Sequence, residues 1–184
     1  LQGLLPRALV TSYAVNGTTT REMLDGADGR EISFSRQMAG SQADVLVLAR
    51  GGNEAYRDIG PEVFKADLNE AIDLALDAGK GVILITGYLT QTAILPTGQW
   101  GTDEFQEQLD ARILVMIQVV KDLAAQYDLL LVDALQISKD LQAAGFRWLI
   151  DDEAHPNTLL SLMIAEELVR ILTGGNMSSV TING

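Results

Sequence analysis

Three short, uninterrupted apolar runs constrain the fold of this chain more than any other feature of its sequence. They occupy residues 45–48, 82–85 and 129–132, and they consist of Val, Ile and Leu without polar alternation. This pattern is typical of parallel strands that are covered on both faces. We therefore expect a buried parallel sheet. A more mixed stretch, residues 8–15, is a fourth strand candidate.

Helical patterns separate these runs. Apolar residues recur at helical spacing over residues 63–78, 104–127 and 158–172, and the first and last of these segments are followed by glycines. The alternation of strand and helix favours βαβ units and an open parallel sheet, that is, an α/β fold. In such sheets functional groups lie just beyond the carboxyl ends of the strands.

Composition limits the classes of partner. The chain has 184 residues, 47% of them hydrophobic, so we expect one globular domain over residues 1–173 and a polar tail or linker over 174–184. A net charge of -12 disfavours nucleic acid and anionic membrane surfaces. No apolar run reaches the roughly 20 residues of a membrane span, and without cysteine the chain has no disulfide or thiol nucleophile.

Two predicted strand exits carry possible hydrogen-bond donors for an oxyanion. Gly17 follows residues 8–15, and its backbone N–H can face an oxyanion, although it could also only permit the turn while a Thr caps the next helix. Asn53 follows residues 45–48, and its side-chain amide is a good oxyanion donor. Alternatively, Asn53 is an ordinary residue of a glycine-rich turn.

A third loop holds His155, the single histidine of the chain. Asp152 lies three residues earlier, and Pro156 helps to fix the backbone at the start of the last helix. An Asp at this spacing can accept a hydrogen bond from one ring nitrogen, which leaves the other to take a proton from a hydroxyl. Metal binding at this loop is a weaker alternative, because a second histidine is missing.

Together these loops resemble the sequence blocks of the SGNH (GDSL-like) hydrolase family. Residues 15–20 are similar to its Gly block, residues 51–54 to its G-x-N-D block, and residues 152–157 to its D-x-x-H block. The resemblance implies a three-layer α/β/α, flavodoxin-like fold. It also implies that Gly17 and Asn53 are oxyanion donors, that His155 is the general base, and that Asp152 orients it. It implies no cofactor and no metal.

Two positions depart from the family pattern. Glu54 replaces the usual Asp, a mild change because that carboxylate is structural in the family. The GDS block with the nucleophilic serine is missing, as is the first strand that would carry it. We consider the serines of the chain, such as Ser12 and Ser161, ordinary polar residues. We expect an upstream segment before Leu1, or a second chain, to supply the nucleophile and the strand.

The resemblance implies a serine esterase acting on an acylated small molecule or glycan, with acetyl removal from a carbohydrate favoured. Tyr56, Tyr88, Trp100 and Trp148 are candidates for lining its cleft, or are ordinary packing aromatics. The main alternative is a noncatalytic SGNH-like structural or carbohydrate-binding module of a larger virion or surface protein. A Rossmann-type nucleotide binder receives little weight, because the G-x-G-x-x-G spacing is missing.

Overall fold

A three-stranded parallel sheet forms the centre of the computed structural model, which describes residues 8–26, 32–89, 103–146, 149–150 and 155–174. The strands β1 (Val45–Ala49), β2 (Gly81–Ile85) and β3 (Leu130–Val132) lie in the order β1-β2-β3. Their register places Leu48 beside Leu84, and Leu84 beside Leu131. The three apolar runs predicted as parallel strands are therefore confirmed.

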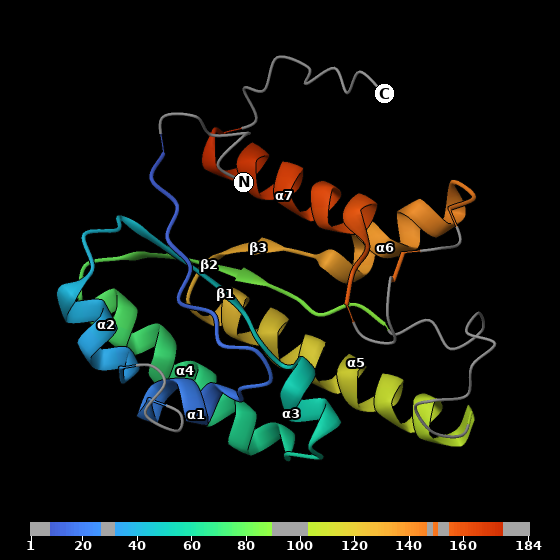
Figure 1. The fold of residues 1–184 in the computed structure, drawn as a ribbon, viewed down its shortest axis with the longest axis horizontal. Helices are drawn as coiled ribbons and strands as arrows, with labels where there is room; N and C mark the ends of the chain where they lie inside the picture. Colours follow the sequence, from blue (N-terminus) through green and yellow to red (C-terminus); the bar gives the residue numbers. More distant parts are fainter. Residues whose placement is uncertain (1–7, 27–31, 90–102, 147–148, 151–154, 175–184) are drawn as a thin grey trace.

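Helices cover both faces of this sheet (Figure 1). On one face lie α4 (Pro61–Asp77) and α5 (Asp103–Gln126), and the short helices α1 (Thr20–Asp25), α2 (Phe34–Gly40) and α3 (Gly52–Tyr56) pack against them. On the other face lie α6 (Ala134–Ala143) and α7 (Thr158–Leu172). This arrangement confirms the predicted three-layer α/β/α fold, and α4, α5 and α7 match the three helical segments predicted from periodicity.

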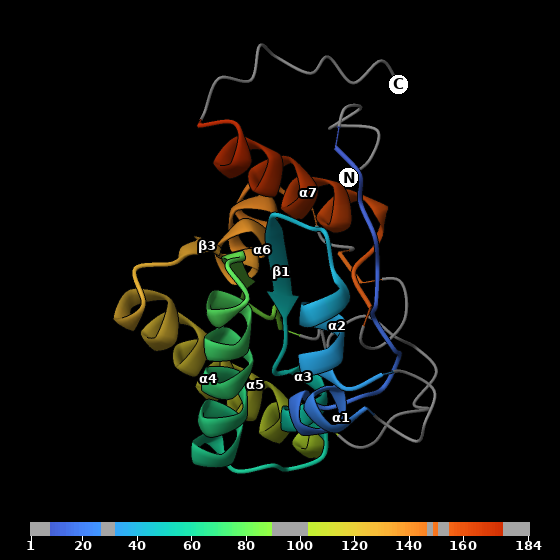
Figure 2. The same cartoon turned by 90° about the vertical axis from the view of Figure 1, so that its left-hand side faces the viewer.

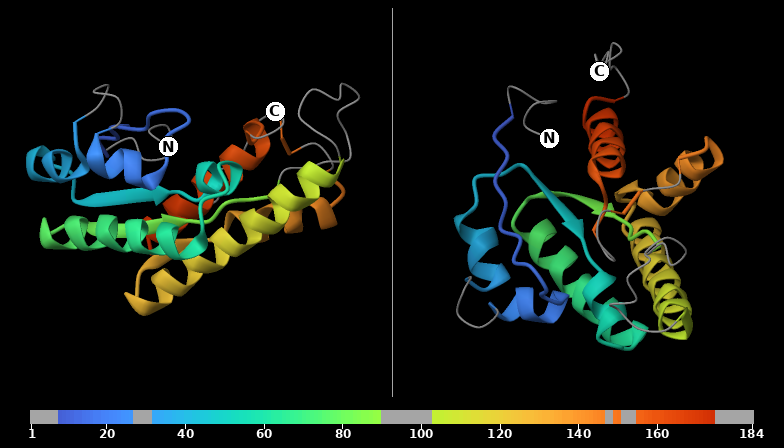
Figure 3. Two further views of the ribbon diagram at one scale, coloured as in Figure 1. Left: turned by 90° about the horizontal axis from the view of Figure 1, so that it is seen from below. Right: turned by 45° about the vertical axis from the view of Figure 1, so that its right-hand side comes forward.

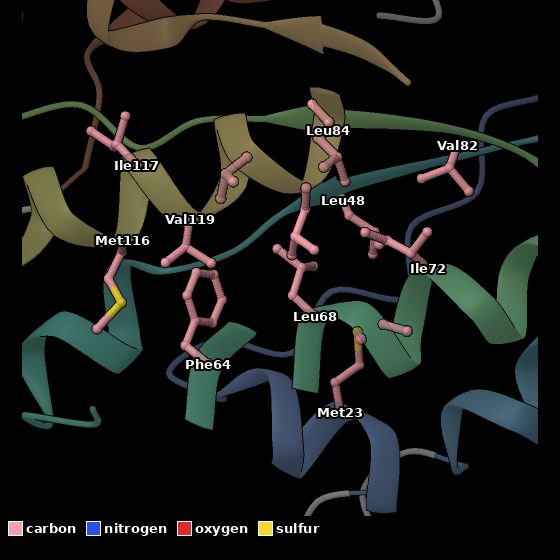
Figure 4. Close-up of a cluster of buried hydrophobic side chains, with 14 of the residues drawn as sticks. Met23, Leu48, Phe64, Leu68, Ile72, Val82, Leu84, Met116, Ile117 and Val119 are labelled. Atoms are coloured by element: carbon pink, nitrogen blue, oxygen red, sulfur yellow. The ribbon is translucent and has the colours of Figure 1, made fainter. Parts of the chain in front are cut away.

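The larger core lies between the sheet and α4 and α5. Figure 4 shows Leu48 and Leu84 of the sheet above Phe64 and Leu68 of α4, and all four side chains are buried. A smaller cluster fills the opposite face, where Ile83 and Val132 meet Leu168 of α7. Burial of these apolar side chains on both faces is what holds the strands in place.

Residues 8–15 do not form the fourth strand that their sequence suggests. They pair with no strand of the sheet, and Figure 2 shows them as a separate trace that leads down to α1. The prediction was wrong because a strand exists only through its hydrogen-bonded neighbour. None of the three described strands of the sheet pairs with this segment.

The edge strand β1 is incompletely covered. It pairs only with β2 among the described strands, and its side chains Val45 and Val47 are 38% and 36% exposed. Leu46 and Leu48 point to the opposite face and pack into the larger core. One face of β1 therefore remains open to solvent where the neighbouring β2 is covered by α7.

None of the described helices combines the length and the apolar character that a bilayer crossing requires.

Gly51 should tolerate no side chain. Its φ is +112°, and an added Cβ would lie 3.2 Å from Met116 Cβ and 3.3 Å from Phe64 Cζ. Gly51→Ala should therefore lower the free energy of unfolding in urea by about 2 kcal/mol, from backbone strain and the clash. Gly52→Ala is the matched control, because its added Cβ meets nothing within 4 Å. A stability loss of equal size in both variants would contradict this account.

Candidate active site

The candidate groups gather at the edge of the sheet where the strands end. There β1 leads through Gly51 into α3, and β3 leads through Asp133 into α6. The N-terminal end of α7 lies at the same edge, as Figure 1 and the right-hand view of Figure 3 show. This edge is the usual place for a ligand site in an open parallel sheet.

Asn53 and the Gly17 loop are in direct contact, although 35 residues separate their sequence positions. The side-chain nitrogen Nδ2 of Asn53 donates to the backbone oxygen of Thr18 over 2.8 Å. This bond uses one of the two amide hydrogens of Asn53. The second hydrogen has no acceptor among the described residues.

Gly17 occupies a turn that exposes its backbone N–H. Its φ is +73°, a conformation that favours glycine, and the space beside it is open to at least 4 Å. Within the described part of the chain, its N–H donates to no acceptor. The Asn53 amide and the Gly17 N–H thus lie on contacting loops, and each has a hydrogen that no described residue accepts.

Two arginines that the sequence analysis did not single out also hold this turn. Arg57 Nη2 donates to the Gly17 backbone oxygen over 2.6 Å, and Arg50 Nη1 lies 3.3 Å from the Thr18 backbone oxygen. The spacing of Asn53 and Arg57 is a signal that could have revealed the second contact. Residues four apart on a helix share a face, so both side chains of this short helical segment reach the same loop.

Arg57 also forms an ion pair with Glu22, over 2.8 Å. Glu22 belongs to a capping box at the start of α1, in which its carboxylate accepts the N–H of Thr19 and the Thr19 hydroxyl accepts the N–H of Glu22. The Thr19 N–H, followed by the Arg57 guanidinium, lowers the pKa of the Glu22 carboxyl below its usual value. Thr19 therefore caps the helix, as the sequence suggested.

Glu54 is buried and serves as a structural acceptor. Its Oε1 accepts the backbone N–H and the hydroxyl of Thr20, over 2.5 and 2.7 Å, and its Oε2 accepts the backbone N–H of Gly51 over 3.0 Å. A carboxylate away from water is stable only when such donors surround it. Glu54 thereby joins the exit of β1 to the start of α1.

His155 is exposed and lies two residues before Asn157, the N-cap of α7. The side chain of Asn157 caps α7 by accepting the Leu160 N–H over 2.9 Å. The backbone N–H of Asn157 donates to the backbone oxygen of Leu149, a residue that is 1% exposed. This buried anchor and the bridge between Ile150 and Pro156 fix the chain on both sides of the loop. Asp152 lies outside the described residues, so its pairing with His155, and the approach of His155 to Gly17 and Asn53, stay predictions.

The remaining strand exits carry a polar pair beside this site. The Thr86 hydroxyl after β2 lies 3.3 Å from Asp133 Oδ1, and Lys121 forms an ion pair with the same carboxylate. Burial raises the pKa of Asp133, but hydrogen bonds from Lys121, the Gln136 N–H and Thr86 outweigh that effect, and the net pKa lies below its ordinary value. Among the described residues, no group of three or more His, Cys, Asp or Glu side chains is placed to hold a metal.

Of the four aromatic residues that are candidates for lining a substrate cleft, the structure describes two, Tyr56 and Tyr88. Tyr56, at the end of α3, is 48% exposed and stands edge-on to Phe105 of α5, with ring centroids 6.2 Å apart. Tyr88 is partly buried. Trp100 and Trp148 lie outside the described residues.

Comparison with known proteins points to one family. The profile of the GDSL-like Lipase/Acylhydrolase family matches residues 1–159. The chain matches no curated protein.

Solved structures share the fold at low identity. A member of the lipolytic protein G-D-S-L family from Veillonella parvula DSM 2008 has a TM-score of 0.72 at 16% identity, over 94% of this chain and 84% of that one. A lipase/acylhydrolase from Enterococcus faecalis has a TM-score of 0.61 at 20% identity, over 90% and 75%. A catalytic mutant of an acetylxylan esterase from Geobacillus stearothermophilus has a TM-score of 0.63 at 19% identity, over 91% of this chain and 76% of that one.

The role of Glu54 can be tested through stability. Glu54→Gln replaces one acceptor oxygen by an amide that faces an N–H, and this should lower the free energy of unfolding by about 1–3 kcal/mol. Chemical denaturation measures the change. Glu107→Gln, at an exposed position of α5, should leave stability within about 0.5 kcal/mol. Equal stability of Glu54→Gln and the parent would contradict the role of the buried carboxylate.

Proposed function

Because the chain belongs to the GDSL-like lipase/acylhydrolase family, we propose that it is a serine esterase that hydrolyses an acyl ester. The observation that supports this proposal is the hydrogen bond from Asn53 to the Thr18 backbone oxygen, which brings the loop of Gly17 into contact with Asn53. For the substrate we propose an acetyl ester on a carbohydrate. The fold shared with an acetylxylan esterase supports this choice.

In the proposed reaction a serine hydroxyl attacks the ester carbonyl. His155 takes the hydroxyl proton, and Asp152 accepts a hydrogen bond from the other ring nitrogen and stabilises the imidazolium. The tetrahedral oxyanion accepts hydrogen bonds from the Gly17 N–H and the Asn53 amide. When the intermediate collapses, the alcohol leaves with the proton from His155, and water then hydrolyses the acyl-enzyme by the same steps.

The nucleophile comes, in this proposal, from a segment upstream of Leu1. The incomplete coverage of β1 supports this source. Its outer edge is unpaired among the described strands, and Val45 and Val47 are exposed on a face that a following helix would cover. A strand added at this edge would deliver its C-terminal residues to the same rim as Gly17 and Asn53, because parallel strands end together.

The described serines fit a catalytic role poorly. Ser12 is exposed in the segment before Gly17 and accepts the N–H of Ala14. Ser138 is buried and donates to the Leu135 oxygen, and Ser161 lies within α7. None of these three occupies a turn directly after a strand, where a nucleophile is commonly presented.

Hydrolysis of p-nitrophenyl acetate by the polypeptide as encoded, including any sequence before Leu1, tests the proposal. His155→Ala should lower kcat by at least about a thousandfold, because the base is lost. Asn53→Ala should lower it by about a hundredfold to a thousandfold, since one oxyanion donor is lost. The control Arg170→Gln changes an exposed ion pair at the far end of α7. Activity that is unchanged in His155→Ala and Asn53→Ala would reject the mechanism.

Labelling locates the nucleophile in the same material. A fluorophosphonate should modify one serine upstream of Leu1, found by peptide mass spectrometry. Modification of a serine within residues 1–184 would refute the proposed source. A label on a separate co-purifying chain would assign the nucleophile to a partner instead. Absence of both label and turnover would favour the noncatalytic module.

A further inference from the structure

The oxyanion donor Gly17 poses a positioning problem. Glycine has the widest conformational freedom of any residue, and this one lies in an exposed turn with open space around it. A donor stabilises a developing charge only when its N–H direction is fixed before the reaction. Something other than local sequence preference must therefore hold the Gly17 peptide units.

The Gly17 N–H belongs to the Asn16–Gly17 peptide unit, and side chains bond to the carbonyl groups of the two peptide units that flank it. The Thr18 hydroxyl donates to the Val15 oxygen over 2.8 Å, which closes the turn on the N-terminal side of Gly17. On the C-terminal side, Arg57 donates to the oxygen of Gly17 itself over 2.6 Å. The bond from Asn53 engages the next carbonyl, that of Thr18. Arg57 is thus the one described side chain that directly fixes the Gly17 carbonyl.

Arg57 is itself fixed by a second contact. Its Nη1 donates to Glu22 over 2.8 Å while its Nη2 holds Gly17, so the planar guanidinium spans both partners. Glu22 is anchored in turn by the Thr19 N–H of the α1 capping box. The guanidinium therefore ties the orientation of the Gly17 turn to the rigid start of a helix.

We propose that Arg57 is a positioning residue, which holds the Gly17 N–H in the direction required for oxyanion binding. This inference rests on the proposed function of Gly17 as a donor. Arg57 is spaced four residues from Asn53, so one short segment both supplies one donor and sets the direction of the other. Substitution of this exposed arginine should consequently lower kcat.

The first test observes Gly17 directly and needs no activity. In Arg57→Gln, the heteronuclear NOE of the Gly17 backbone amide should fall and its hydrogen exchange should speed up, because the carbonyl anchor is lost. Arg170→Gln is the matched control, since it also breaks an exposed arginine–glutamate pair. An unchanged Gly17 amide in Arg57→Gln overturns the proposal, whatever the activity.

The second test separates kcat from KM with p-nitrophenyl acetate and the full encoded polypeptide. Arg57→Gln should lower kcat by about tenfold to a hundredfold and change KM by less than about twofold, because the affected contact forms only in the transition state. Arg57→Lys should give an intermediate kcat, since an ammonium lacks the fork that spans both partners. A merely structural role predicts neither the selective kcat loss nor this partial rescue.

The outcomes distinguish this inference from the proposed function. If kcat is unchanged in Arg57→Gln while Asn53→Ala and His155→Ala lose activity, the positioning role is wrong and the esterase mechanism stands. If all three variants retain full activity, the mechanism itself is wrong, and the inference fails with it. A loosened Gly17 amide together with a selective loss of kcat supports both.

Discussion

The buried carboxylate of Glu54 is the interaction on which the geometry of this edge depends. It accepts hydrogen bonds from Gly51 at the exit of β1 and from Thr20 at the start of α1, and so joins two loops that are distant in sequence. Once these loops are joined, Asn53 reaches the Thr18 carbonyl and Arg57 reaches that of Gly17. The placement of the candidate donors therefore depends on the buried carboxylate of Glu54, which joins their two loops.

Much of the architecture was predictable from local patterns. Continuous apolar runs predicted the strands β1, β2 and β3, and apolar periodicity predicted α4, α5 and α7. The sequence did not predict that one face of β1 is left exposed. The failure at residues 8–15 has a clear physical cause. Strand propensity is realised only through pairing, which depends on a neighbour that the sequence of the segment itself does not encode. The short helices α2, α3 and α6 were not predicted, because apolar periodicity is hard to recognise over only one to three helical turns.

The sequence blocks singled out Gly17, Asn53 and His155, and the catalytic roles of all three stay predictions. The structure brings Asn53 into contact with the loop of Gly17, although residues 8–15 before that loop form no strand. Arg57 carries no motif of its own. Its role emerges only when the fold places its guanidinium between Glu22 and the Gly17 carbonyl. The pairing of Asp152 with His155 remains a prediction, since the structure does not describe Asp152.

The most direct test is a crystal structure of the complete encoded polypeptide after reaction with a phosphonate ester, whose phosphoryl oxygen mimics the tetrahedral oxyanion. The account predicts this oxygen at about 3 Å from both the Gly17 backbone nitrogen and Asn53 Nδ2, with the His155 ring in contact with the modified serine oxygen. An adduct whose phosphoryl oxygen contacts neither donor, or a His155 ring that lies away from the serine, would contradict it.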